Sequence, residues 1–146
     1  MTTDSTRLLR LLERRLDLLG TLTVTLQESR NDFVAMDLSG MERRIAEQEQ
    51  LCARIRSLDS EISSVQAQCA GRAGLPDIDV KNGEQIRVML ARISAAQLEL
   101  KRANDAHQAM LRRSRRTVQV LLNVFSSFAP TYSAPVSVES TYEERV

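Results

Sequence analysis

Residues 83–128 read GEQIRVMLARISAAQLELKRANDAHQAMLRRSRRTVQVLLNVFSSF, and this stretch decides the fold. It contains no proline, and one set of its residues recurs in alternating steps of three and four. This spacing places the set on one side of an α-helix. The sequence therefore predicts one helix over 83–128, about 69 Å long at ~1.5 Å per residue. Its seam consists of Ile86, Leu90, Ile93, Gln97, Leu100, Asn104, His107, Leu111, Ser114, Val118, Leu121, Phe125 and Phe128.

A stripe with the same spacing runs along residues 5–36 and predicts a first helix there. Arg15 and Ser29 interrupt the stripe. Residues 21–26 read TLTVTL and alternate with a period of two, as in a short strand. A helix is still expected, because the stripe continues through this segment and an isolated strand has no partner. The stripe consists of Leu8, Leu12, Leu19, Leu22, Leu26, Phe33 and Met36.

A second helix is predicted over residues 40–70. Ser39 and Glu42 have the spacing of a capping box, in which each side chain accepts the backbone amide of the other residue. The stretch GRAGLP at 71–76 ends the helix, because glycine and proline are typical of helix C-termini. The seam of this helix consists of Met41, Leu51, Ile55, Leu58, Ile62, Val65 and Cys69.

The predicted fold class is all-α: long antiparallel helices that form an elongated helical bundle or coiled coil. Residues 1–132 are expected to form a single helical domain, and the polar residues 133–146 a flexible, disordered tail. If the helices run up, down and up, the third extends beyond the other two from about residue 114. The predicted helices cover about residues 5–36, 40–70 and 83–128.

The composition argues against an enzyme. Only 3% of the 146 residues are aromatic, and the chain has a single histidine, the side chain that acid–base chemistry at neutral pH uses most often. His107 lies on the seam of the third helix among Gln97, Asn104 and Ser114, and Asn104 could at best form a hydrogen bond with it. A polar layer that fixes helix register is the favoured interpretation of these residues. No cofactor and no catalytic residues are expected.

Metal and membrane sites are not expected either. Cys52 and Cys69 are 17 residues apart without a second pair, which is neither a zinc pattern nor a disulfide framework. The N-terminal residues lack the pattern of a signal peptide, and no apolar run approaches 18 residues. These patterns predict a protein of the cytoplasm.

The excess of positive charge is concentrated in the last predicted helix. Residues 83–128 carry eight basic and three acidic residues, a net charge of +5, whereas the whole chain carries +1. The densest cluster is RRSRR at 112–116. Without aromatic side chains for stacking, nucleic-acid binding is not expected. A solvated helix face and docking to an acidic protein surface both remain open.

The apolar stripe widens directly after this cluster. Val120 and Val124 extend the seam to roughly half of the circumference, whereas a helix in a small bundle needs about a third. A fold-back or homodimer contact could cover the extra surface, or it could be a helix-in-groove site for a partner. The surface consists of Val118, Leu121, Leu122, Phe125 and Phe128 together with the two valines.

Over about residues 8–132 the chain resembles the FlgN-type flagellar export chaperones. The resemblance is carried by the opening LLRLL at 8–12, by DLSGM at 37–41, by NDAH at 104–107, by MLRRSRRTVQVLL at 110–122 and by Tyr132. The order of these elements supports the resemblance more than any single motif does.

The resemblance implies a helical chaperone that binds the amphipathic C-terminal helices of hook-filament junction proteins. It implies delivery of these clients to the flagellar export gate and ATPase-complex components, with only peripheral association with the membrane export apparatus. The client site would correspond to about 104–128, and Tyr132 to the position for docking at the gate, although SAP at 133–135 replaces the usual glycine. The alternative is a structural homodimeric coiled-coil protein without a secretion client. The expected client-binding residues are Leu111, Val118, Leu121, Leu122, Phe125 and Phe128.

Overall fold

The computed structural model describes residues 2–71 and 80–128, and all of these except a short turn at 35–37 lie in helices. Helix α1 spans Thr2–Val34, α2 spans Leu38–Gly71 and α3 spans Val80–Phe128. The predicted all-α fold class is confirmed. The tail predicted for 133–146 lies outside the described residues. The chain divides into two compact units, residues 1–110 and 111–146.

The helix accommodates the three threonines of the strand-like segment of α1. Thr21, Thr23 and Thr25 each donate a hydrogen bond of 2.9 Å to the carbonyl oxygen four residues earlier. This bond keeps a β-branched polar side chain compatible with a helix, even at Thr25, which is buried. The prediction of a continuous helix through residues 21–26 is confirmed.

A tight turn joins α1 to α2, and its geometry differs from the prediction at Met36 and at the residue that caps α2. Met36 has a φ of 58° and an exposed side chain, so it belongs to the turn and not to the seam of α1. Asp37 caps α2, because its Oδ1 accepts the amide of Gly40 at 2.9 Å. The capping box predicted at Ser39 is therefore wrong, since Ser39 already lies inside α2. A Cβ on Gly40 would collide with the Asp37 carboxylate, which explains the glycine.

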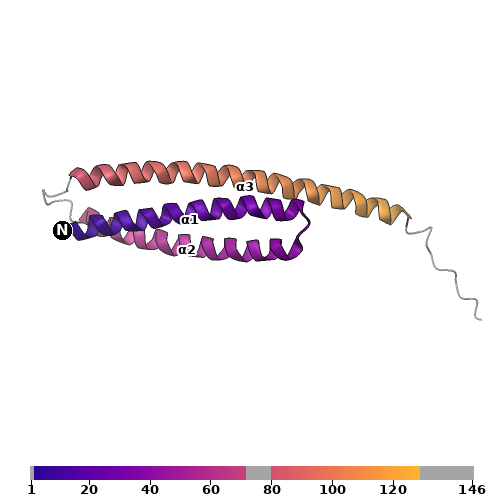
Figure 1. The fold of residues 1–146 in the computed structure, drawn as a ribbon, viewed down its shortest axis with the longest axis horizontal. Helices are drawn as coiled ribbons and strands as arrows, with labels where there is room; N and C mark the ends of the chain where they lie inside the picture. The colour runs from indigo at the N-terminus through magenta and orange to yellow at the C-terminus, as the bar shows by residue number, and fades with distance from the viewer. Residues whose placement is uncertain (1, 72–79, 129–146) are drawn as a thin grey trace, which may run out of the picture. The chain divides into compact units, whose positions relative to one another are not determined.

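Helices α1 and α2 form an antiparallel hairpin (Figure 1). Two ion pairs join the helices: Arg7 with Glu61 at 2.9 Å, and Arg15 with Asp59 at 2.7 Å. Towards the turn between the helices, Arg44 of α2 reaches carboxylates of both helices. Ion pairs between α1 and α2 thus lie both near the turn and further along the hairpin, around an apolar interior.

The part of α3 before Leu111 packs on this hairpin through its own inward face (Figure 1). It runs parallel to α1, since Met89 lies near Leu9 and Arg102 near Gln27. Met89 is buried whereas its neighbour on the predicted seam, Leu90, is 40% exposed, so the seam is displaced by one residue there. The core of this unit consists of Leu8, Leu11, Leu12, Leu19, Leu58, Ile62, Val65, Met89 and Ile93.

Candidate functional site

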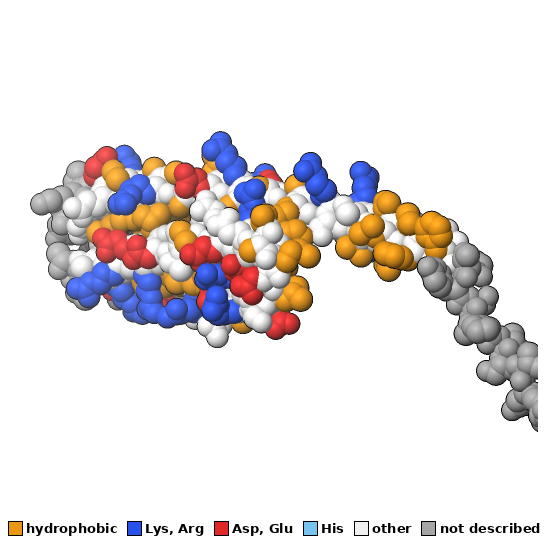
Figure 2. Space-filling model, turned by 45° about the vertical axis from the view of Figure 1, so that its right-hand side comes forward, with side chains coloured by type: hydrophobic (Ala, Val, Ile, Leu, Met, Phe, Trp, Pro, Cys, Tyr) orange, Lys and Arg blue, Asp and Glu red, His pale blue; other side chains and the backbone are white. Residues whose placement is uncertain are grey.

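The apolar side chains of the second unit, residues 111–128 of α3, are exposed (Figure 2). In the core of the first unit, by contrast, buried leucines expose at most 8% of their surface. Phe125 is the most exposed of the predicted client-binding residues, at 69%. We call these six residues the apolar face: Leu111 41%, Val118 51%, Leu121 51%, Leu122 54%, Phe125 69% and Phe128 56%.

Helical geometry brings the six residues of the apolar face together on one side of α3. At about 100° per residue they fall within an arc of roughly 120°, and Val120 and Val124 extend this arc to about 200°. Val120 and Val124 are themselves 55% and 45% exposed. The opposite side is polar: the Gln119 amide donates a hydrogen bond of 3.1 Å to Oδ1 of Asn123. Residues 111–128 thus form an amphipathic helix with an unusually wide apolar side.

The four arginines of the cluster at 112–116 are exposed and form no ion pair within the part of the chain that the structure describes. The sequence contains no Asp or Glu between Asp105 and Glu139. Arg44 provides the contrast, since it contacts Glu28, Asp32 and Glu47 at 2.7–3.3 Å. Within residues 2–71 and 80–128, the positive charge next to the apolar face is therefore not neutralised by acidic side chains.

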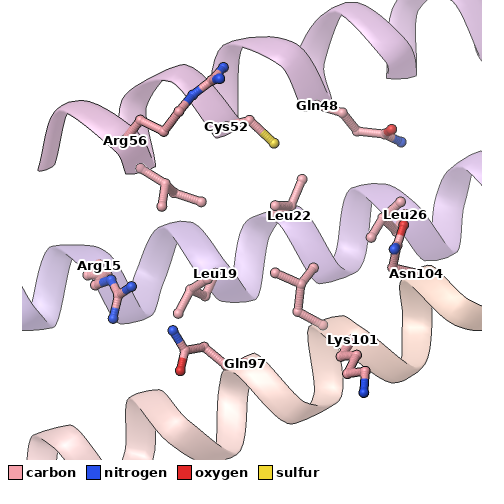
Figure 3. A pocket seen from close by; sticks show the side chains of 12 residues that line it. Arg15, Leu19, Leu22, Leu26, Gln48, Cys52, Arg56, Gln97, Lys101 and Asn104 are labelled. Atoms are coloured by element: carbon pink, nitrogen blue, oxygen red, sulfur yellow. The ribbon is translucent and has the colours of Figure 1, made fainter. Parts of the chain in front are cut away.

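A cleft of about 740 Å³ lies in the first unit, between α2 and α3 and above α1 (Figure 3). Leu19 and Leu22 lie at its floor, while Cys52 of α2 and Gln97 of α3 flank them. The leucines at its floor, Leu19 and Leu22, are only 4–7% exposed. Polar seam residues such as Gln97 fill the space less completely than leucine would, and we assign the cleft to this imperfect packing.

His107, the only histidine, lies half-buried in the first unit. Its Nδ1 is buried without a hydrogen-bond partner among the described residues. Burial lowers the pKa of His107, and the positive charge of Arg30 lowers it further. Within the described ranges, no three His, Cys, Asp or Glu side chains come together as a metal site.

The structure thus brings the six predicted client-binding residues together on one face, while the predicted docking residue Tyr132 lies outside the described residues. Periodicity does not reveal the cleft, because its lining comes from three helices and a pattern within one helix does not give the fit between helices. None of the helices, over the residues described, has an apolar stretch long enough to cross a membrane.

A helical bundle unit followed by an amphipathic helix with an exposed apolar face defines a class of protein: helical proteins that bind other proteins. The comparison with protein families gives the particular family. The family model described as FlgN protein matches residues 1–136. The chain therefore belongs to the FlgN family, which is a family of flagellar export chaperones. No curated protein and no solved structure matches the chain.

Proposed function

We propose that this chain binds the C-terminal helices of hook-filament junction proteins through the apolar face of residues 111–128. The single observation that supports this proposal is the exposure of 41–69% of all six side chains of that face. An exposed contiguous apolar patch in a protein of a chaperone family is typical of a protein-binding site. The proposal makes the chain a binding protein and not an enzyme.

The chemistry of such a client fits this face. The terminal helices of a filament subunit bury their apolar stripes only on assembly, and beforehand those stripes favour aggregation. A second amphipathic helix can lie along the apolar face with its own residues at steps of three and four, as in helix-in-groove recognition. Coverage by the chaperone would therefore prevent premature assembly.

The proposed function includes delivery. In the cytoplasm the chain holds its client and carries it to the flagellar export gate and its ATPase-complex components, associating with the membrane only through that apparatus. Tyr132, which follows α3 in the sequence, is the residue proposed to dock at the gate. Release at the gate requires moderate affinity. Such affinity is expected, because ordering costs offset much of the apolar burial.

The test is a double substitution on the apolar face, Leu121→Ala with Phe125→Ala, in the full chain. These residues are four apart and expose 51% and 69% of their surface, so truncation removes client contacts without opening a core cavity. We expect client affinity to fall about 100-fold, since two truncated anchors cost roughly 3 kcal/mol. Calorimetry with a peptide of the junction protein's C-terminal helix measures the change.

The matched control is Gln119→Ala with Asn123→Ala, which has the same four-residue spacing on the polar side of the same helix. It should retain wild-type affinity. Equal affinity for the wild type and for the variant with both substitutions on the apolar face would contradict the proposal. If that variant instead dissociates a stable dimer in sedimentation, the homodimeric coiled-coil alternative gains the support.

A further inference from the structure

The apolar face accounts for client binding but leaves the arginine cluster without a role. Four guanidinium groups that form no ion pair among the described residues lie next to an apolar docking surface, where they create a local positive potential. Like charges three or four residues apart destabilise an isolated helix slightly, so the cluster does not serve the stability of α3. The positions of the arginines around the helix suggest what they contact.

The four arginines divide into two pairs. The position of each arginine is given as its angle around the helix axis from the mean direction of eight apolar side chains. These eight are the six residues of the apolar face together with Val120 and Val124. At about 100° per residue, Arg113 and Arg115 then each lie about 100° away, on opposite sides. Arg112 and Arg116 each lie about 160° away, on the polar side with Gln119 and Asn123. Arg113 and Arg115 therefore lie at the two edges of the apolar surface, Arg113 about 20° inside the Val120 edge and Arg115 about 20° outside the Leu122 edge, whereas Arg112 and Arg116 lie on its back.

We propose, on the basis of the proposed function, that Arg113 and Arg115 select clients whose binding helix carries carboxylates on both flanks of its apolar stripe. This is the position that the charged e and g residues occupy in coiled coils, where they set partner choice and orientation. The carboxylates lie at the end of the client helix that covers residues 111–118. Arg112 and Arg116 take no part in this contact.

Charge complementarity favours an acidic client over a second copy of this chain. A second copy that docked its own apolar face here would bring residues 111–128, which contain no carboxylate and the same four arginines. Nucleic acid would neutralise the arginines but would leave eight exposed apolar side chains uncovered. An acidic amphipathic helix satisfies both the charge and the apolar surface.

The test compares two charge reversals that change the net charge equally. One is Arg113→Glu with Arg115→Glu, and the other is Arg112→Glu with Arg116→Glu; glutamate and arginine have similar helix propensity. In the full chain, the flanking reversal should weaken binding of the junction-protein C-terminal peptide about tenfold at 50 mM salt. The deficit should shrink at 500 mM salt because of screening. The back reversal should stay within about twofold of the wild type.

A second peptide, with the Asp and Glu residues that flank its apolar stripe changed to Asn and Gln, completes the design. It should bind the wild type and the flanking reversal equally. Equal loss from both reversals would overturn the proposal, because long-range attraction does not distinguish faces. Salt-sensitive binding of a 20-base-pair duplex, abolished by both reversals while peptide affinity is unchanged, would also overturn it. If Leu121→Ala with Phe125→Ala abolishes binding but neither reversal matters, only this inference fails.

Discussion

The two units of the chain use the same residue types at the same spacing and bury them differently. In residues 1–110, leucines at steps of three and four expose 8% or less in the core. In residues 111–128, leucines at the same steps expose 41–54%. The pattern thus determines that both segments are helical, but burial depends on a partner surface. An apolar seam that remains exposed is therefore informative about binding.

Matched leucine substitutions give the strongest test of this difference. Leu12 in α1 is 1% exposed and Leu121 in α3 is 51% exposed, and each is replaced by alanine in a separate variant. Leu12→Ala should lower the free energy of unfolding by about 2–5 kcal/mol, because it leaves a cavity in the core. Leu121→Ala should change it by less than about 0.5 kcal/mol. Urea unfolding followed by circular dichroism measures both.

One outcome of the Leu12 and Leu121 substitutions would contradict the exposure of residues 111–128. A similar loss of stability in the two variants would mean that residues 111–128 are packed in solution, either on the same chain or on a second copy. Repeating the unfolding of the Leu121→Ala variant at several protein concentrations separates these cases, because only dimer stability depends on concentration.

The arginines offer a second, smaller contrast between the units. Arg44 contacts Glu28, Asp32 and Glu47, whereas Arg112 has no ion pair in the described residues. Arg44→Ala should lower the urea midpoint measurably, because it leaves three carboxylates near one another at the turn end of the hairpin. Arg112→Ala should leave the midpoint unchanged. High salt should reduce the effect of Arg44→Ala, and an effect insensitive to salt would exclude an electrostatic origin.

The parts of the fold that follow from periodicity were predictable from the sequence. The stripe of α1 places Leu8, Leu12 and Leu19 on one side, and all three are buried. The residue that caps α2 was not predictable in this way, because it depends on the geometry of the turn before the helix. Asp37 caps α2 in place of Ser39, because the turn at Met36 brings its carboxylate to the amide of Gly40.

The candidate site was predictable for a similar reason. The excess width of the apolar stripe after residue 116 is a property of the sequence alone, and the exposure of Phe125 agrees with it. The cleft was not predictable, because it arises from the fit of Gln97 and Asn104 against a helix distant in sequence. Periodicity also does not reveal that the Nδ1 of His107 is buried without a hydrogen-bond partner among the described residues.

The smallest predicted effect is the contribution of His107 to the pH dependence of stability, which tests how tightly α3 is packed near residue 107. Because burial and Arg30 lower its pKa below the ordinary value of 6.5, the unfolded chain binds a proton there before the folded chain does. Stability should therefore fall as the pH drops from 7.5 through 6.5, and level off below the folded pKa. His107→Gln should remove this component, so its urea midpoint should fall less than that of the wild type between pH 7.5 and 5.5. Equal falls in both proteins would mean that the imidazole is solvated, and that α3 is loosely packed near residue 107.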